Sequence, residues 1–323
     1  MKFLLTAINA KFIHSNPAIY SLRAGAGEKL QPYVELAEFT INESLESILE
    51  GIWKRQPKVI GFSCYIWNWK LIREILTELP KILPDTEIWL GGPEVTYDGP
   101  GLLREFPQVT GIMVGEGEVT FWEVLDHYVR EAESTGQSEQ QPEPDSIEQQ
   151  AADRTGTVAG KSVAERFGRI SGLCLASGYT APRELTDLTT LPFLYEDMEP
   201  FTNRIIYYET SRGCPYRCSY CLSSIDKKVR LRDIDVVKRE LQFFLDQNVK
   251  QVKFIDRTFN CDHKHAMEIW RYIYEHDNGV TNFHFEISAD ILREEEIALL
   301  NRFRPGLAQL EIGVQSTNPE TIR

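Results

Sequence analysis

Three cysteines lie within eight residues of one another, in the stretch CPYRCSYC that runs from Cys214 to Cys221. Their spacing, C-x3-C-x2-C, brings three sulfurs of one loop close enough to bind a single metal centre. Iron–sulfur clusters are held by cysteine thiolates, commonly four, so three thiolates leave one iron without a protein ligand. An open coordination position is typical of a catalytic metal site. The stretch therefore predicts an iron–sulfur site at Cys214, Cys218 and Cys221 with one position free.

In a second interpretation, a fourth protein ligand fills the free coordination position. Cys261, which has His263 and His265 beside it, could supply a fourth ligand. The result would be a closed four-cysteine site in a non-catalytic or electron-transfer protein. The two other cysteines, Cys64 and Cys174, are expected to be buried thiols in apolar surroundings, the usual place of a free cysteine.

The composition narrows the setting. The chain has 323 residues, 42% of them hydrophobic, which is enough for two domains. No run of eighteen apolar residues is present, so no transmembrane helix and no membrane partner are expected. Six cysteines, three of them clustered, are not the pattern of a disulfide framework. Free thiols are typical of the reducing cytoplasm, so we expect the protein there. A net charge of −13 disfavours binding to nucleic acids, which leaves a small-molecule substrate.

An acidic stretch divides the chain. Residues 131–152 carry six acidic residues, no Lys or Arg and almost no large apolar side chain. Such a segment buries too little surface to offset the entropy that ordering it would cost. We therefore expect an acidic flexible linker over 133–164 and a connector over 165–200. The flanking domains would span 1–132 and 201–323.

The first domain alternates strand and helix patterns. Five apolar runs read as strands: Phe3–Ile8, Val34–Phe39, Val59–Cys64, Ile88–Gly92 and a part of Gly111–Glu118. Apolar residues recur at helical spacing after most of them. This order predicts a Rossmann-like α/β fold, with a parallel five-stranded sheet and helices on both faces. Sheets of this kind bind ligands beyond the carboxyl ends of their strands.

Glycines and small polar residues gather at these strand ends. Glycine lets a backbone approach a bulky ligand closely, although the same glycines could simply form tight turns. The candidate ligand-binding residues are Ser63, Gly91, Gly92, Pro93, Gly115, Glu116 and Gly117.

The second domain alternates in the same way. Its expected strands are Ile205–Tyr208, Val252–Ile255, Phe283–Ile287 and Ala308–Ile312, with helical patterns between them. This alternation predicts a partial (β/α) barrel. The three cysteines follow the first strand, on the face where such folds place their chemistry.

The stretch RGCPYRCSYC resembles the signature loop of the radical S-adenosylmethionine enzymes, C-x3-C-x-aromatic-C, with Tyr220 at the aromatic position. The resemblance implies that the three cysteines hold a 4Fe-4S cluster. S-adenosylmethionine would chelate the open iron through its amino and carboxylate groups, and its cleavage would yield a 5′-deoxyadenosyl radical. It also implies that Tyr220 packs near the adenine, and that a reductant such as flavodoxin or ferredoxin supplies the electron.

Three further stretches resemble parts of the same family. KFIDRTFN resembles the second-strand segment that meets the methionine end, which makes Asp256 a candidate contact, although the family's Gly-Gly-Glu form is absent. FEISAD resembles the segment whose acidic residue faces the ribose, which points to Glu286. EIGVQST resembles the fourth strand and its turn. This resemblance makes Gln315 a candidate contact of S-adenosylmethionine at the rim of the barrel, with Ser316 beside it. The alternatives are a strand-end cap for Asp256 and a barrel-interior pair with Arg257 for Glu286.

The stretches GGPEVT and GEGEVTF resemble the cobalamin-binding domain that precedes one class of radical S-adenosylmethionine enzymes. Many cobalamin domains place Asp-x-His-x-x-Gly after their first strand, so that the His binds cobalt. Here the loop reads NAKFIHSNPAI, with His14 but without the Asp and the Gly. His14 is therefore a candidate cobalamin residue, together with the strand-end residues named above.

These resemblances imply a cobalamin-dependent radical enzyme that transfers a methyl group to carbon, or rearranges or cyclises its substrate. A tRNA methylthiotransferase-like enzyme is an alternative, but that group carries three further cysteines in its N-terminal domain, where this chain has Cys64. The family's barrel has six βα units, whereas this chain stops after the fourth expected strand. We therefore expect a chain that is truncated within its barrel.

Overall fold

The structure is a computed structural model that describes residues 1–134, 161–226 and 228–322. Most of the acidic linker expected over 133–164 lies outside the described residues. The chain divides into two compact units, one formed by 1–186 with 194–196 and the other by 187–193 with 197–323. We describe each unit by itself.

Unit 1 is built on a seven-stranded sheet in the order β2-β1-β3-β4-β5-β6-β7. Its strands are β1 (Phe3–Asn9), β2 (Val34–Thr40), β3 (Val59–Ser63), β4 (Glu87–Gly91), β5 (Val109–Met113), β6 (Leu173–Leu175) and β7 (Gly178–Tyr179). The first five are parallel, which confirms the predicted sheet. The last two are antiparallel and extend it. They come from the segment 165–200, which the sequence analysis treated as a connector.

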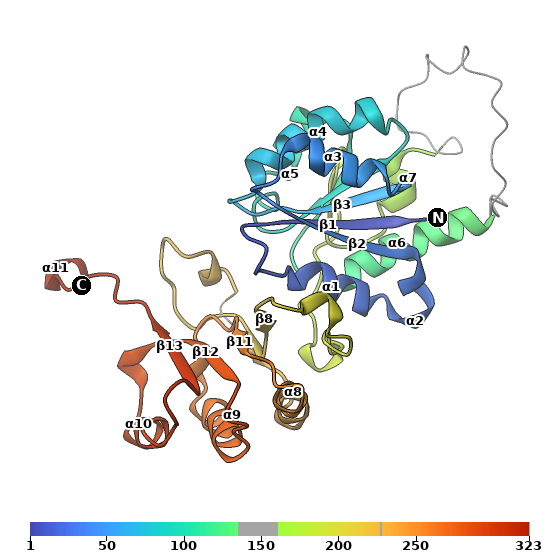
Figure 1. Ribbon diagram of the computed structural model, residues 1–323. Coiled ribbons are helices and arrows are strands. Elements are labelled where there is room, and N and C mark those ends of the chain that lie inside the picture. The colour runs from blue at the N-terminus through green and yellow to red at the C-terminus, as the bar shows by residue number, and fades with distance from the viewer. Residues whose placement is uncertain (135–160, 227, 323) are drawn as a thin grey trace, which may run out of the picture. The chain divides into compact units, whose positions relative to one another are not determined.

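Helices cover both faces of this sheet (Figure 1). They are α1 (Pro17–Gly25), α2 (Gly27–Leu30), α3 (Leu45–Trp53), α4 (Trp69–Ile82), α5 (Gly99–Glu105), α6 (Glu118–Ser134) and α7 (Val163–Phe167), with a 3-10 turn η1 (Gln31–Tyr33). Side chains of a strand alternate between its faces. On β1, Leu4 therefore packs with the α3 and α4 side, while Phe3 and Leu5 pack with the α1 and α6 side.

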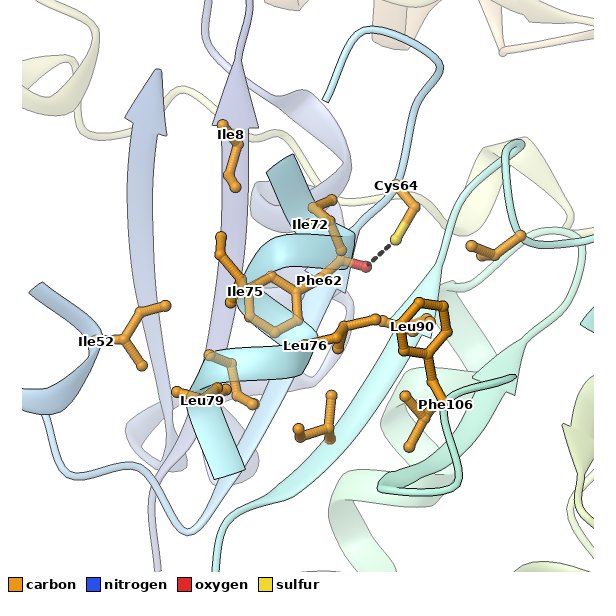
Figure 2. Close-up of a cluster of buried hydrophobic side chains, with 14 of the residues drawn as sticks. Ile8, Ile52, Phe62, Cys64, Ile72, Ile75, Leu76, Leu79, Leu90 and Phe106 are labelled. Carbon is orange, nitrogen blue, oxygen red and sulfur yellow. Dashed lines mark hydrogen bonds between the residues drawn. The ribbon is translucent and has the colours of Figure 1, made fainter. Parts of the chain in front are cut away.

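Figure 2 shows the core on the α4 side, where Ile72 and Leu76 of α4 lie over Phe62 of β3. Cys64 ends this cluster, and its thiol donates a hydrogen bond to the carbonyl oxygen of Phe62 at 3.5 Å. Burial raises the pKa of Cys64 far above its ordinary value. Cys64 and Cys174 are both fully buried, as predicted for structural thiols.

The strand order reverses between β1 and β3, because the chain runs outward from β1 to β2 and then returns to β3 on the other side. Helices on the two sides of such a point leave in opposite directions, so the carboxyl ends of the strands open a crevice there. The loops that follow β1, β3, β4 and β5 all begin at this carboxyl edge of the sheet.

Unit 2 contains a parallel sheet in the order β13-β12-β11-β8, as expected for part of a (β/α) barrel. Its strands are β8 (Ile206–Tyr208), β9 (Ser211–Arg212), β10 (Arg230–Leu231), β11 (Gln251–Phe254), β12 (Asn282–Ile287) and β13 (Ala308–Ile312). Its helices are α8 (Ile234–Asp246), α9 (His263–Glu275), α10 (Glu294–Leu300) and α11 (Pro319–Ile322), with 3-10 turns η2 (Leu188–Thr190), η3 (Glu199–Phe201), η4 (Leu222–Ser224), η5 (Phe259–Cys261) and η6 (Ala289–Ile291). Strands β9 and β10 form a separate antiparallel ribbon around the cysteine loop.

The two faces of this second sheet differ. Phe254 and Phe285 are fully buried on one face, with ring centroids 4.5 Å apart, and Trp270 of α9 packs edge-on against Phe285. The neighbouring residues in each strand point the other way, and among them are Lys253 and Glu286, which form an ion pair. The sheet is therefore apolar toward its helices and charged on its other face.

Candidate functional site

A cavity of about 360 Å³ lies in unit 1 at the crevice where the strand order reverses. It is lined by the ends of β3, β4 and β5 and extends along the sheet beneath α1. Its lining residues are Phe3, Leu5, Ala18, Ile19, Leu22, Gly61, Phe62, Ser63, Tyr65, Trp89, Leu90, Gly91, Gly92, Pro93, Thr96, Tyr97, Met113, Gly115, Gly117 and Glu118. Six of the eight residues predicted for a ligand in this domain are among them; the two others are His14 and Glu116.

Glycines shape this cavity in two ways. Gly92 has a φ of +105°, and a Cβ there would lie 2.5 Å from the carbonyl oxygen of Cys64, so the turn after β4 requires glycine. Gly61 lies within β3, where a Cβ would lie 3.2 Å from both Leu5 and Phe3. The first glycine therefore makes the turn, while the second keeps the space beside β1 open.

The loop after β1 is fastened to one carboxylate. Glu38 accepts hydrogen bonds from the Asn9 side chain at 2.8 Å, the Asn16 backbone N–H at 3.0 Å and the Tyr20 hydroxyl at 2.7 Å. The side chain of Asn9 also donates to the carbonyl oxygen of His14 at 3.0 Å. His14 thus belongs to a loop with a fixed backbone, next to the cavity lining but outside it.

The loop after β3 is held by Asn68, which is fully buried. Its side-chain oxygen accepts from the Tyr65 N–H at 2.8 Å, and its nitrogen donates to the carbonyl oxygens of Ile8 at 3.0 Å and Ser63 at 2.9 Å. The ring of Tyr65 stacks on Trp67, with centroids 4.4 Å apart. Ile66 between them is 80% exposed. This apolar loop at the cavity was missed by the sequence analysis, although the run Tyr65–Trp67 after a predicted strand was a visible signal.

The cysteine loop of unit 2 follows β8 and β9. Gly213 precedes the first cysteine with a φ of +94°, and a Cβ there would lie 2.4 Å from the carbonyl oxygen of Lys228. The N–H of Cys214 donates to the carbonyl oxygen of Asp226 at 2.9 Å, so the returning chain holds the start of the loop. Cys214 is buried, whereas Cys218 and Cys221 are exposed, and none of the three is in a disulfide. The loop thus has one anchored and two accessible thiols.

Asp256 lies at the base of this loop and is 1% exposed. Its carboxylate accepts from the Thr210 N–H at 3.1 Å, the Thr210 hydroxyl at 2.6 Å and the Ser211 hydroxyl at 2.6 Å. Burial raises the pKa of Asp256, against these hydrogen bonds, which lower it. In this structure Asp256 joins the end of β11 to the strand that leads into the cysteines.

The charged face of the sheet holds Glu286. Its partner is Lys253, at 3.3 Å, rather than Arg257. Lys253 also binds Glu311 at 3.0 Å, and Glu311 in turn contacts His284 at 3.1 Å. Burial lowers the pKa of Lys253, but the hydrogen bond and the charge of Glu311, together with Glu286, outweigh burial and raise it. One lysine thus holds two carboxylates side by side.

Three further predicted residues lie in loops. Tyr220 is 73% exposed, Gln315 is exposed in the loop after β13, and Ser316 beside it is half-buried. Cys261 is linked to the first cysteine through Thr258: the Cys261 N–H donates to the Thr258 carbonyl oxygen at 3.0 Å, and the Thr258 hydroxyl oxygen lies 3.5 Å from the Cys214 sulfur. Burial raises the pKa of Cys261. In the part of the chain that the structure describes, no three His, Cys, Asp or Glu side chains converge closely enough to hold one metal ion.

Two family models match this chain in the order of its units. The B12 binding domain matches residues 4–125 and the Radical SAM superfamily matches residues 208–323. This chain thus carries a B12 binding domain followed by a radical SAM domain. The first match spans β1 to β5 with the cavity, and the second begins at the end of β8 and contains the cysteine loop.

Relatives of this B12-binding radical SAM protein include methyltransferases. An uncharacterized methyltransferase of Pyrococcus horikoshii is 26% identical over 70% of this chain and 45% of its own length. The cobalamin-dependent radical SAM methyltransferase TokK of Streptomyces tokunonensis is 28% identical over 63% of this chain and 28% of its own length. The chain thus spans less than half the length of either relative.

A solved structure shares the fold of the whole chain. It is the radical S-adenosylmethionine methyltransferase TsrM from Kitasatospora setae, with cobalamin and a [4Fe-4S] cluster bound. The TM-score is 0.67 at 17% identity, over 99% of this chain and 60% of that one. Among the residues that the structure describes, no helix is long and apolar enough to cross a membrane.

The radical SAM domain implies a 4Fe-4S cluster with S-adenosylmethionine, and the B12 binding domain implies cobalamin. The residues present fit both. A 4Fe-4S cluster places each thiolate on a different iron, so three free thiols of one loop suit it better than a single ion that needs convergent ligands. The cavity is largely apolar with a few polar groups, which is typical of a small-molecule cofactor site.

Proposed function

We propose that this protein binds cobalamin at the cavity of unit 1 and a 4Fe-4S cluster with S-adenosylmethionine at the cysteine loop of unit 2. We further propose that it transfers a methyl group to an unreactive carbon of a small molecule. When bound, the cluster and S-adenosylmethionine supply a 5′-deoxyadenosyl radical and cobalamin supplies a methyl group. A one-electron reductant is then required as a partner. A radical removes hydrogen from positions that no acid or base can ionise, and this removal opens such a carbon to methylation.

The cavity supports the first part of the proposal through its size and lining. About 360 Å³ holds one aromatic group of nucleotide-base size, so it suits the tail of cobalamin and not the whole molecule. We assign the orientation of such a tail to Ser63 and Glu118, two of the polar side chains in a largely apolar lining. Trp67 and Ile66 are exposed in the loop that carries Tyr65, so they offer apolar area to the larger part of the ligand.

The cysteine loop and the charged sheet face support the second part. Cys214, Cys218 and Cys221 are the proposed cluster ligands. Glu286 and Glu311, held together by Lys253, are hydrogen-bond acceptors for hydroxyl groups of S-adenosylmethionine or of the substrate. In this proposal Asp256 positions the cysteine loop, because its carboxylate holds Thr210 and Ser211 on the segment that leads into the cysteines.

The observation that carries the proposal is the loop itself. It contains three free thiols, one buried and two exposed, directly after the first strand of a parallel sheet. A fully closed structural site would instead place a fourth ligand among them. His14 and Tyr220 stay predictions for the cobalamin and adenine contacts.

The test is anaerobic reconstitution of the full chain with iron and sulfide, followed by electron paramagnetic resonance spectra before and after addition of S-adenosylmethionine. We expect a reduced cluster whose signal changes when S-adenosylmethionine occupies the open iron. Cys218→Ala should lose the cluster and Cys261→Ala should keep it. Equal loss in both variants would support the closed four-cysteine site, with Cys261 as the fourth ligand.

A second arm tests the cavity independently of the cluster. Hydroxocobalamin added to the full chain should shift its visible spectrum in the wild type and equally in Cys218→Ala, because the thiols play no part in that binding. A folded chain without affinity for cobalamin at high micromolar concentration would remove cobalamin from the proposal and leave the cluster in place.

A further inference from the structure

A threonine hydroxyl lies next to the one buried cysteine of the loop. The hydroxyl oxygen of Thr258 and the sulfur of Cys214 are 3.5 Å apart, within hydrogen-bond distance for sulfur. Thr258 is 6% exposed and Cys214 is 8% exposed, so water does not compete freely for either group. Cys218 and Cys221 are exposed, so the three thiols stand in unequal surroundings.

The chain fixes both partners of this contact. Asp256, two residues before Thr258, binds Thr210 and Ser211 on the strand that leads to Cys214. The carbonyl oxygen of Thr258 accepts from the N–H of Cys261 at 3.0 Å, in the turn that follows. Asp256 therefore ties the two segments together before the hydrogen bond, and the turn to Cys261 holds the backbone of Thr258 after it, which makes the contact a consequence of the fold.

The direction of this hydrogen bond depends on the state of the sulfur. In the free protein either the thiol or the hydroxyl can donate. A cysteine that ligates iron is a thiolate without a proton, so only the hydroxyl of Thr258 can then donate. A hydrogen bond to a ligating sulfur stabilises negative charge, and the reduced cluster carries one electron more than the oxidised cluster.

We infer that Thr258 is a positioning residue that donates a hydrogen bond to Cys214 in the cluster-bound protein and raises the reduction potential of the cluster. This inference rests on the proposed function. The step concerned is the uptake of one electron from a low-potential one-electron donor, in which no bond breaks and no proton moves. The hydroxyl makes that electron easier to accept, which eases the reduction that must precede cleavage of S-adenosylmethionine.

The test is a redox titration of the reconstituted full chain, monitored by electron paramagnetic resonance, with dithionite as the reductant. Thr258→Val keeps the shape of the side chain and removes the hydroxyl, while Thr258→Ser keeps the hydroxyl. At a fixed potential, we expect the ratio of reduced to oxidised cluster to fall on the order of tenfold in Thr258→Val, which is ~59 mV for one electron. Thr258→Ser should stay near the wild type.

Two controls separate the hydrogen bond from packing. Thr281→Val removes another buried threonine hydroxyl of unit 2, which bonds Asn278, and should leave the potential unchanged. Iron and sulfide contents should match among the proteins compared. If Thr258→Val takes up no cluster, Thr258→Ala replaces it in the titration, since the smaller side chain adds no bulk beside the sulfur.

The outcomes are distinct. A wild-type cluster whose potential is the same in Thr258→Val overturns the inference and leaves the proposed function intact. A potential that falls equally in the serine variant also overturns it, since packing would then be the cause. A wild-type chain that takes up no cluster overturns the proposed function and this inference with it.

Discussion

The sheets of the two units bury their faces differently. On β1 of unit 1, the neighbours Leu4 and Leu5 point to opposite faces and are both buried. On β12 of unit 2, Phe285 is fully buried while its neighbour Glu286 lies on the charged face. A sheet covered on both sides leaves its strand ends open to a ligand, and the cavity of unit 1 begins there and extends along the sheet beneath α1. A sheet covered on one side offers a whole face of polar side chains besides its loops.

The largest effect should come from a variant pair on β12. Phe285→Ala removes a ring that contacts Phe254, Phe259 and Trp270, and should destabilise unit 2 by about 3–5 kcal/mol. Glu286→Ala, one residue along, should cost less than about 1 kcal/mol because it loses only a partly exposed ion pair. Urea unfolding followed by circular dichroism measures both.

The same experiment on β1 sharpens the comparison. Leu4→Ala and Leu5→Ala should each destabilise unit 1 by about 2–5 kcal/mol, since both side chains are buried. A difference as large as that between Phe285 and Glu286 would show that one face of the first sheet contributes little. Equal, small costs in the β12 pair would contradict the one-sided burial of unit 2.

A second pair tests whether glycine keeps the cavity open. The added methyl of Gly61→Ala would lie 3.2 Å from Leu5 and Phe3, so these side chains must move, at a cost of about 1–3 kcal/mol. Gly91→Ala would place its methyl 3.8 Å from Met113, an ordinary contact, with a cost within about 0.5 kcal/mol. Thermal unfolding and hydroxocobalamin titration should both find Gly61→Ala the more affected. The reverse order would locate the ligand away from β3.

The smallest effect concerns the charged face of unit 2. The hydrogen bond from Lys253 lowers the pKa of Glu311 below its ordinary value of 4.5. A carboxyl whose folded pKa is depressed stabilises the fold above its unfolded pKa and loses that contribution as the pH falls through the folded pKa. Because Glu311 is 55% exposed, this contribution should be no more than about 0.5 kcal/mol.

Glu311→Gln should therefore flatten the decline of the unfolding free energy below about pH 4.5 and change little at neutral pH. Urea unfolding at a series of pH values measures it, with the exposed Glu295→Gln as the matched control. An identical pH slope in the wild type and Glu311→Gln would mean that solvent screens the pair completely.

The sequence alone determined four strands of each sheet to within about two residues, because apolar runs and alternation record which side chains must leave water. The strand expected within Gly111–Glu118 begins earlier, at Val109, and ends at Met113. The sequence also predicted a metal site at the three cysteines, because their spacing lies within a single loop and needs no tertiary contact to be recognised. Strands β6 and β7 were missed. They are short and antiparallel, and their residues become strand only because β6 pairs with the edge of β5 and β7 pairs with β6.

The tertiary structure alone decided which residues meet. Gly91 and Gly117 line the cavity, whereas Glu116 turns away and accepts the Thr186 N–H, a contact across 70 positions of the chain. The partner of Glu286 is Lys253 of the adjacent strand because strand register, not proximity in sequence, sets which side chains touch. Thr258 reaches Cys214 for the same reason, through two loops joined by the buried carboxylate of Asp256. Spacing along a chain specifies local chemistry, but contacts between distant loops exist only after the sheet has brought their strands into register.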